Sequence, residues 1–226
     1  MVLHNILMQV TAVTGMNYYS PNLPETPFFF PPPKHNWDPA SAKHLAKLSG
    51  CIGPIRRPID IANPDQSRII LHLRDPRDVL TSLFFSHCYS HFGFETRAQE
   101  REEWIKAGID KFVLDKSHDY AERYDAYCNT LFGRPNVTFV TYEEMVQSFE
   151  TWLIKFLAPF RLPQNEQITG NILLQYKNEF RVPSEDITQH KRKITPGDYL
   201  EKLRPETIHT LNQKFSRSLE KLGYQP

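Results

Sequence analysis

The middle of the chain changes abruptly from apolar to charged residues and back again. Residues 68–73 read RIILHL, in which every residue after the opening arginine is apolar or histidine and no turn former interrupts the run. Such a run is typical of a strand that is buried on both faces. After the charged sequence Arg-Asp-Pro-Arg-Asp, apolar positions return three and four residues apart, which predicts a helix over residues 78–87.

The rest of the chain continues this succession of strands and helices. A helix over residues 3–13 is expected to end at Gly15, and residues 137–142 form a second apolar run that predicts a buried strand. Pro205 suits the first turn of the last helix, and Gly223 suits its end. The other expected elements are a short helix over 41–48, a short strand near 51–52, a charged helical segment over 95–116, and helices over 120–131 and 148–157. Strands separated by helices predict an α/β fold with a parallel sheet flanked by helices.

Residues 20–39 interrupt the pattern with a dense run of prolines and aromatic residues. Prolines this close together cannot form a regular element, so we expect an extended loop. Its aromatic side chains either cover the core or form one wall of a substrate pocket, and the sequence leaves both interpretations open.

Composition narrows the classes of partner. The 226 residues are enough to bury a sizeable core. Lys and Arg total 27 against 26 Asp and Glu, a net charge of +1 that gives no indication of a nucleic-acid or anionic-membrane partner. Any anion site must therefore be local, built from a few placed side chains.

Cysteine usage and hydropathy indicate the compartment. Cys51, Cys88 and Cys128 lie far apart and form no CxxC pair, so we expect reduced, mostly buried thiols rather than a zinc site or a disulfide framework. No stretch reaches the roughly 18 apolar residues of a membrane span. The apolar N-terminus carries no basic leader and no clear cleavage site, so we expect a soluble, cytoplasmic protein.

The charged junction after the first buried strand is a candidate anion site. Arg74 follows the strand directly, at the edge of a parallel sheet where ligands bind, and its planar guanidinium suits phosphate oxygens. Asp75 can cap the next helix, with Pro76 and Asp78 at its first and third positions, and a helix N-terminus favours an anion. Ser82 adds a hydroxyl one turn further on. A capped helix with an Arg–Asp ion pair would use the same residue types, so both interpretations remain open.

A second basic cluster lies late in the chain. His190, Lys191, Arg192 and Lys193 directly precede a segment with a Pro-Gly turn. Basic residues beside a turn can fold over a phosphate and shield it. They can also form an ordinary solvated surface loop.

Four segments, taken in order, resemble the sulfotransferase family. They read RIILHLRDPRDVLTSLFFSH at 68–87, VTFVTYEEMVQSFETWLIKFLAPFRLP at 137–163, HKRKITPGDY at 190–199 and LEKLGY at 219–224. The first resembles the family's 3′-phosphate-binding segment, and the last resembles its closing helix. The resemblance implies a P-loop-NTPase-like parallel sheet. It also implies transfer of a sulfonate group from 3′-phosphoadenosine 5′-phosphosulfate (PAPS) to an acceptor hydroxyl or amine.

The resemblance assigns cofactor-binding roles to five residues. Arg74 and Ser82 would bind the 3′-phosphate, and Arg192 and Lys193 would close over the same phosphate. Tyr142 matches the family tyrosine near the adenine. No metal is required for this chemistry, and the sequence shows no metal-ligand spacing.

Some positions depart from the family pattern or carry no binding role. Ile194 stands where the family usually has glycine, which puts a backbone contact to the phosphate in doubt, and Tyr199 replaces the usual tryptophan. Glu143 and Glu144 are expected to hold local structure.

The domain of sulfotransferase family members begins with a strand and a Pro-Lys-x-Gly-type loop that holds the 5′-phosphosulfate. Residues 1–15 resemble the helix that follows that loop. We therefore expect residues 1–226 to form a single sulfotransferase-like domain that is partial at its N-terminus and lacks the first strand and the phosphosulfate loop. The chain would then be either a piece of a longer protein or a degenerate relative with weak or no activity.

The sequence assigns neither a catalytic base nor an acceptor. Many family members place a histidine upstream of the strand-end arginine, but the corresponding segment here reads GCIGPIRRP. The remaining candidates for a base or a substrate contact are His35, His87, His91, Arg56 and Arg57. The acceptor is expected to be a small molecule, a lipid or a carbohydrate, bound by loops within 20–40 and 88–118.

Two other functions remain open. A non-catalytic binding protein could have been built on a decayed sulfotransferase fold. A P-loop phosphotransferase would need a Gly-Lys-Ser/Thr loop and a magnesium-binding acid, and the sequence contains neither pattern.

Overall fold

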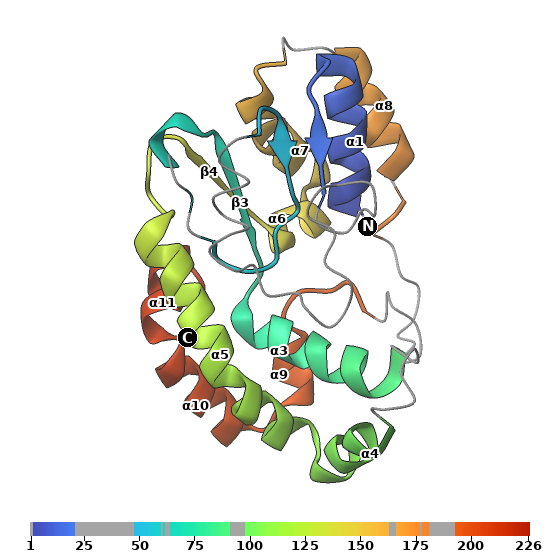
Figure 1. The fold of residues 1–226 in the computed structure, drawn as a ribbon. Helices are drawn as coiled ribbons and strands as arrows, with labels where there is room; N and C mark the ends of the chain where they lie inside the picture. Colours follow the sequence, from blue (N-terminus) through green and yellow to red (C-terminus); the bar gives the residue numbers. More distant parts are fainter. Residues whose placement is uncertain are drawn as a thin grey trace.

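The two apolar runs form neighbouring parallel strands. In the computed structural model, β3 (Ile69–Leu73) pairs with β4 (Val137–Thr141), with Ile69 opposite Val137 and Leu73 opposite Thr141. A second parallel pair joins β1 (Tyr18–Tyr19) to β2 (Cys51–Ile52). The structure describes residues 2–20, 48–59, 61, 64–90, 98–162, 166–176, 178–180 and 193–226. The expected α/β fold with parallel strands and flanking helices is confirmed (Figure 1).

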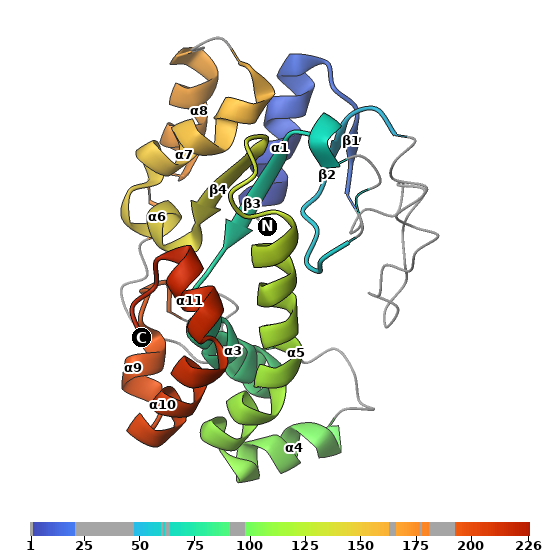
Figure 2. The same ribbon diagram turned by 90° about the vertical axis from the view of Figure 1, so that its left-hand side faces the viewer.

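Alternate side chains of β3 enter two hydrophobic cores. Leu71 and Leu73 belong to a core that also includes residues of α3 (Pro76–Phe85), α5 (Ile109–Thr130), α10 (Pro205–Lys214) and α11 (Ser216–Leu222). Ile70 packs against the other core, which is built from α1 (Val2–Thr14), α7 (Phe149–Leu157) and α8 (Glu166–Tyr176). Figures 1 and 2 show these two groups of helices at opposite ends of the molecule, with β3 and β4 between them.

The remaining elements are short or lie at the edges. They are η1 (Pro64–Gln66), the π-helical turn η2 (Ser86–Ser90), α4 (Ala98–Ala107), α6 (Tyr142–Gln147), η4 (Ala158–Phe160) and α9 (Asp198–Lys202). Among the described residues, none of the helices has the length and hydrophobicity that a membrane span requires. Cys88 and Cys128 are buried free thiols, and Cys51 is a half-buried one.

Several predicted boundaries were wrong. The chain does not break between 95–116 and 120–131, because α5 runs unbroken through 109–130 without a glycine or proline, and the helix boundary falls at Gly108 with a φ of 85°. The expected last helix is two helices, α10 and α11, which meet at Phe215. Helix α8 was not predicted. Residues 21–47 lie outside the described residues, and with them most of the proline-rich segment and of the helix expected over 41–48.

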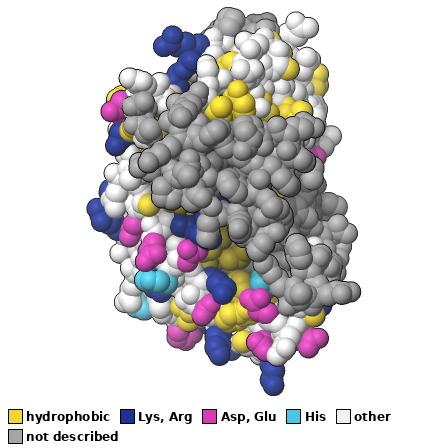
Figure 3. Space-filling model, in the orientation of Figure 1, with side chains coloured by type: hydrophobic (Ala, Val, Ile, Leu, Met, Phe, Trp, Pro, Cys, Tyr) yellow, Lys and Arg dark blue, Asp and Glu magenta, His cyan; other side chains and the backbone are white. Residues whose placement is uncertain are grey.

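On the face drawn in Figure 3, described basic and acidic side chains lie interspersed over the half of the molecule that contains α3, α9 and α10. This distribution agrees with the balanced net charge of +1. An anion site on this chain must therefore depend on individual side chains.

Candidate functional site

The parallel pairing of β3 and β4 brings two helix starts together. Because both strands end at the same edge of the sheet, α3 and α6 begin side by side there. Asp75 caps α3 as the sequence predicts, with its carboxylate accepting the Arg77 N–H at 2.9 Å and Pro76 in the first turn. Proline has no N–H, and the Arg77 N–H already has a partner. The start of α3 therefore has fewer free N–H donors for an anion than the sequence suggested. The positive charge at this edge comes mainly from side chains.

Arg74 faces a small pocket beside the first turns of α3. The pocket has a volume of about 200 Å³ and is lined by Arg74, Val79, Ser82, Leu83, Ser86 and Tyr120. The Arg74 Nε is buried and has no hydrogen-bond partner among the described residues. A buried guanidinium N–H without a partner is costly, so this donor is suited to an anionic ligand. Arg74 and Ser82, which sequence analysis paired, thus lie at the same pocket.

Tyr142 lies against Arg74 at the start of α6. The Arg74 guanidinium carbon is 4.4 Å from the centroid of the Tyr142 ring, which is a cation–π arrangement. Burial raises the pKa of the Tyr142 hydroxyl. The described lining of the pocket does not include Tyr142, so its contact with the site runs through the Arg74 side chain.

Asp78 joins α3 to the backbone at the start of α9. It is 0% exposed, and its two carboxylate oxygens accept the N–H groups of Gly197 at 2.7 Å and Tyr199 at 3.0 Å. The Arg74 Nη2 lies 3.4 Å from the same carboxylate. Burial raises the pKa of the Asp78 carboxyl, and the Arg74 charge and the two N–H groups partly offset that shift. The segment before α9 is therefore fixed beside α3.

Lys193 is engaged by acidic side chains of α9. Its Nζ lies 2.6 Å from the Glu201 Oε2 and 3.2 Å from the Asp198 Oδ1, and its side chain is 17% exposed. The hydrogen bond to Glu201 raises the pKa of Lys193, which keeps it charged. A phosphate at this position would have to compete with these carboxylates. Arg192, like His190 and Lys191, lies outside the described residues.

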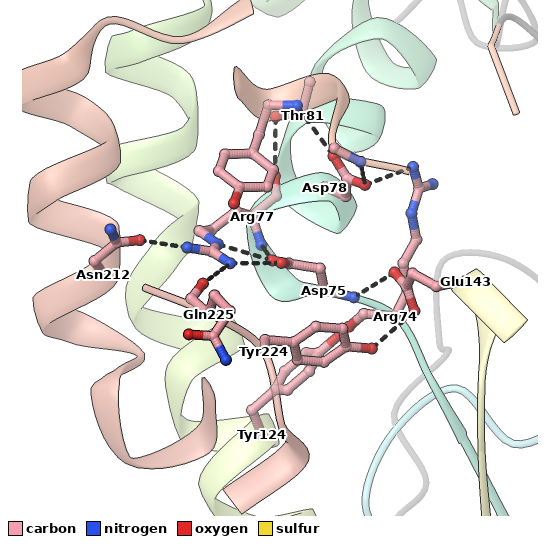
Figure 4. Close-up of polar contacts among 12 residues, drawn as sticks. Arg74, Asp75, Arg77, Asp78, Thr81, Tyr124, Glu143, Asn212, Tyr224 and Gln225 are labelled. Carbon is pink, nitrogen blue, oxygen red and sulfur yellow. Dashed lines mark hydrogen bonds and ion pairs between the residues drawn. The ribbon is translucent and has the colours of Figure 1, made fainter. Parts of the chain in front are cut away.

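Arg77 is a structural residue that sequence analysis did not identify. It is 1% exposed, and its guanidinium donates to both oxygens of Asp75 at 3.0 and 2.7 Å. It also donates to the Asn212 Oδ1 at 2.6 Å and the Gln225 carbonyl at 2.7 Å (Figure 4). Its guanidinium carbon lies 4.3 Å from the centroid of the Tyr199 ring. The Arg–Asp ion pair that was an alternative to an anion site is therefore present twice, as Arg77 with Asp75 and as Arg74 with Asp78. Arg74 nevertheless also lines the pocket.

Glu143 and two tyrosines hold the junction between β3 and α3. The Glu143 Oε1 accepts the Asp75 N–H at 3.0 Å, and its Oε2 accepts the Tyr224 hydroxyl at 2.8 Å (Figure 4). The Tyr124 hydroxyl donates to the Arg74 carbonyl at 2.5 Å. Spacing gives no signal for the two tyrosines, because their partners are 50 and 81 residues away in the chain.

Glu144 holds local structure, as expected. Its carboxylate accepts the Thr141 N–H at 3.2 Å, and the Thr141 hydroxyl accepts the Glu144 N–H at 3.0 Å, which forms a capping box at the start of α6.

No catalytic base emerges from the described candidates. The His87 Nε2 lies 3.7 Å from the Glu100 Oε1, and the Arg57 Nη1 lies 3.9 Å from the Asp119 Oδ1. Neither these two nor Arg56 line the pocket. His35 and His91 lie outside the described residues. Within the described ranges, no group of three or more His, Cys, Asp or Glu side chains could hold a metal ion.

One family model matches most of the chain. A family model described as the sulfotransferase domain matches residues 60–223, which include every residue of the site described above except Tyr224 and Gln225. The structure is similar to the crystal structure of mouse sulfotransferase SULT7A1 complexed with PAP, with a TM-score of 0.64 and 17% sequence identity. The match covers 96% of this chain and 78% of that one. None of the curated proteins compared with the chain matches it by sequence.

Proposed function

The chain belongs to the sulfotransferase family, and we propose that it transfers a sulfonate group from PAPS to an acceptor hydroxyl or amine. The acceptor would belong to a small molecule, a lipid or a carbohydrate. The nucleotide product would be 3′-phosphoadenosine 5′-phosphate (PAP), the ligand named for the mouse sulfotransferase.

One observation carries this proposal: Arg74 has a buried, unpartnered Nε among the described residues and shares a pocket with the Ser82 hydroxyl. A guanidinium and a hydroxyl are donors that suit a phosphate dianion, and the pocket lies at the ligand-binding edge of the parallel strands. We assign the 3′-phosphate of the nucleotide to Arg74 and Ser82.

Other side chains would complete the nucleotide site. Tyr142 would lie near the adenine while its ring packs against the Arg74 guanidinium. Lys193 and Arg192 would close over the 3′-phosphate, which requires Lys193 to exchange Glu201 for a phosphate oxygen. PAPS supplies an activated sulfonate, and the chain would act mainly by positioning it and by neutralising phosphate charge.

A thermal-shift measurement with a transfer assay tests this function. PAP should raise the melting temperature of the wild-type chain, because a ligand that binds only the folded state stabilises it. Arg74→Ala should remove the shift, whereas Arg204→Ala should keep it, since Arg204 is an exposed arginine that pairs with Asp110. Circular dichroism would verify that both variants are folded.

The outcomes separate the alternatives. Sulfonate transfer from PAPS to any acceptor in a panel of phenols, amines, sterols and sugars would establish the activity. Binding of PAP without transfer would favour a non-catalytic binding protein. A larger shift with ATP and magnesium than with PAP, or a PAP shift retained by Arg74→Ala, would contradict the proposal.

A further inference from the structure

The peptide unit between Arg74 and Asp75 is hydrogen-bonded at both its C=O and its N–H group. Its carbonyl, on Arg74, accepts the Tyr124 hydroxyl of α5 at 2.5 Å, and its N–H, on Asp75, donates to the Glu143 Oε1 of α6 at 3.0 Å. Because a peptide unit is planar, fixing the C=O and the N–H fixes its orientation. The orientation of the peptide unit bonded to the Arg74 Cα is therefore held by two side chains outside α3.

The C-terminal segment, residues 223–226, supplies the next contact. Gly223 ends α11 with a φ of 79°, and the chain then turns so that the Tyr224 hydroxyl donates to the Glu143 Oε2 at 2.8 Å. The next residue, Gln225, offers its carbonyl to the Arg77 Nη2 at 2.7 Å. Figure 4 shows the resulting row from Tyr224 through Glu143 to the Asp75 N–H.

We propose that Tyr224 is a positioning residue for Arg74, so that the C-terminal segment sets the affinity of the 3′-phosphate site. This inference rests on the proposed function, since it takes Arg74 to be the residue that binds the 3′-phosphate. Tyr224 does not line the pocket, and it acts through Glu143 and the 74–75 peptide unit.

The chemistry of Glu143 explains why one hydroxyl matters. Its carboxylate is partly buried, and burial raises its pKa, while the Asp75 N–H and the Tyr224 hydroxyl favour the charged form. Without the tyrosine hydroxyl, one oxygen of a partly buried carboxylate loses its donor, which is more costly than losing a solvated contact. Turning towards water or taking up a proton then becomes more favourable for the Glu143 carboxyl. Either change weakens its hydrogen bond with the Asp75 N–H.

The test uses the full chain with Tyr224→Phe, which keeps the ring and removes only the hydroxyl. Calorimetric titration with PAP should show binding about 3- to 10-fold weaker than that of the wild type. This is less than the direct loss of a hydrogen bond to a charged group would cost, because Tyr224 acts on Arg74 only through Glu143. Titration with adenosine 5′-phosphate, which lacks the 3′-phosphate, should show little change. Tyr127→Phe is the matched control, because Tyr127 and Tyr224 pack against the same hydrophobic core. This variant should bind PAP and adenosine 5′-phosphate as tightly as the wild type does.

Nucleotide selectivity distinguishes positioning from general destabilisation. If Tyr224→Phe weakened PAP and adenosine 5′-phosphate equally, or left both unchanged, Tyr224 would not position Arg74 and the inference would be overturned. If the wild type bound the two nucleotides equally, the assignment of Arg74 to the 3′-phosphate would fall, and this inference with it. The inference is supported if Tyr224→Phe weakens the binding of PAP but not of adenosine 5′-phosphate, and if Tyr127→Phe changes neither.

Discussion

At the scale of single residues, the charged motif divides into one side chain that faces a pocket and several that support it. Arg74 lines the pocket, while Asp75 and Arg77 form a buried ion pair and Asp78 binds two backbone N–H groups. Buried charges of this kind are tolerated because each one is paired and hydrogen-bonded. The charge pattern alone does not distinguish the arginine that lines the pocket from the structural one, because both are arginines next to an aspartate.

His72, two residues before Arg74, gives a pH-dependent prediction. Its ring packs against Trp152 with centroids 5.7 Å apart, and burial lowers the pKa of the imidazole to about 4. Between that value and the usual pKa of about 6.5, the unfolded chain binds a proton that the folded chain does not, so stability falls as the pH falls. His72 alone should cost about 2 kcal/mol between about pH 7 and about pH 5.

Urea denaturation at the two pH values measures this effect. His72→Leu should reduce the acid-induced loss of unfolding free energy by about that amount, since leucine does not titrate. An equal loss in the wild type and the variant would show that His72 does not stay neutral in the folded chain.

At the scale of elements, the site depends on two strand-to-helix junctions placed side by side. Strand β4 passes into α6 without a loop, because Thr141 ends the strand and caps the helix. This places Tyr142 against Arg74 and Glu143 against the Asp75 N–H. A shift at the start of α6 would therefore move two supports of Arg74 together.

The capping box at this junction is expected to contribute measurably to stability. Thr141→Ala removes the hydroxyl that accepts the Glu144 N–H and should lower the unfolding free energy by about 1 kcal/mol. Thr138→Ala, on the same strand but outside the cap, reports the cost of replacing a β-branched residue. If the two variants lost the same stability in urea denaturation, the cap would contribute nothing of its own.

At the scale of the whole molecule, the sequence predicted the local features and missed the distant partners. The apolar runs at 68–73 and 137–142 and the Asp75 cap follow from short-range patterns, and the structure confirms them as β3, β4 and the N-cap of α3. The contacts of Asp78 with Gly197 and of Glu143 with Tyr224 join positions 119 and 81 residues apart. Such pairs depend on how β3, β4 and the C-terminal helices pack, which no local pattern encodes. The length of α5 was missed because its polar middle resembles a linker.

The central claim is that Arg74 and Ser82, together with the basic residues before α9, bind one phosphate, with Arg74 as its main ligand. Calorimetric titration of the wild type and Arg74→Ala with PAP and with adenosine 5′-phosphate tests it most directly. Loss of the 3′-phosphate should weaken binding to the wild type by about 100-fold, the effect of one to two charge-assisted hydrogen bonds, and should weaken binding to Arg74→Ala by much less. The same loss of affinity in both proteins would contradict the account.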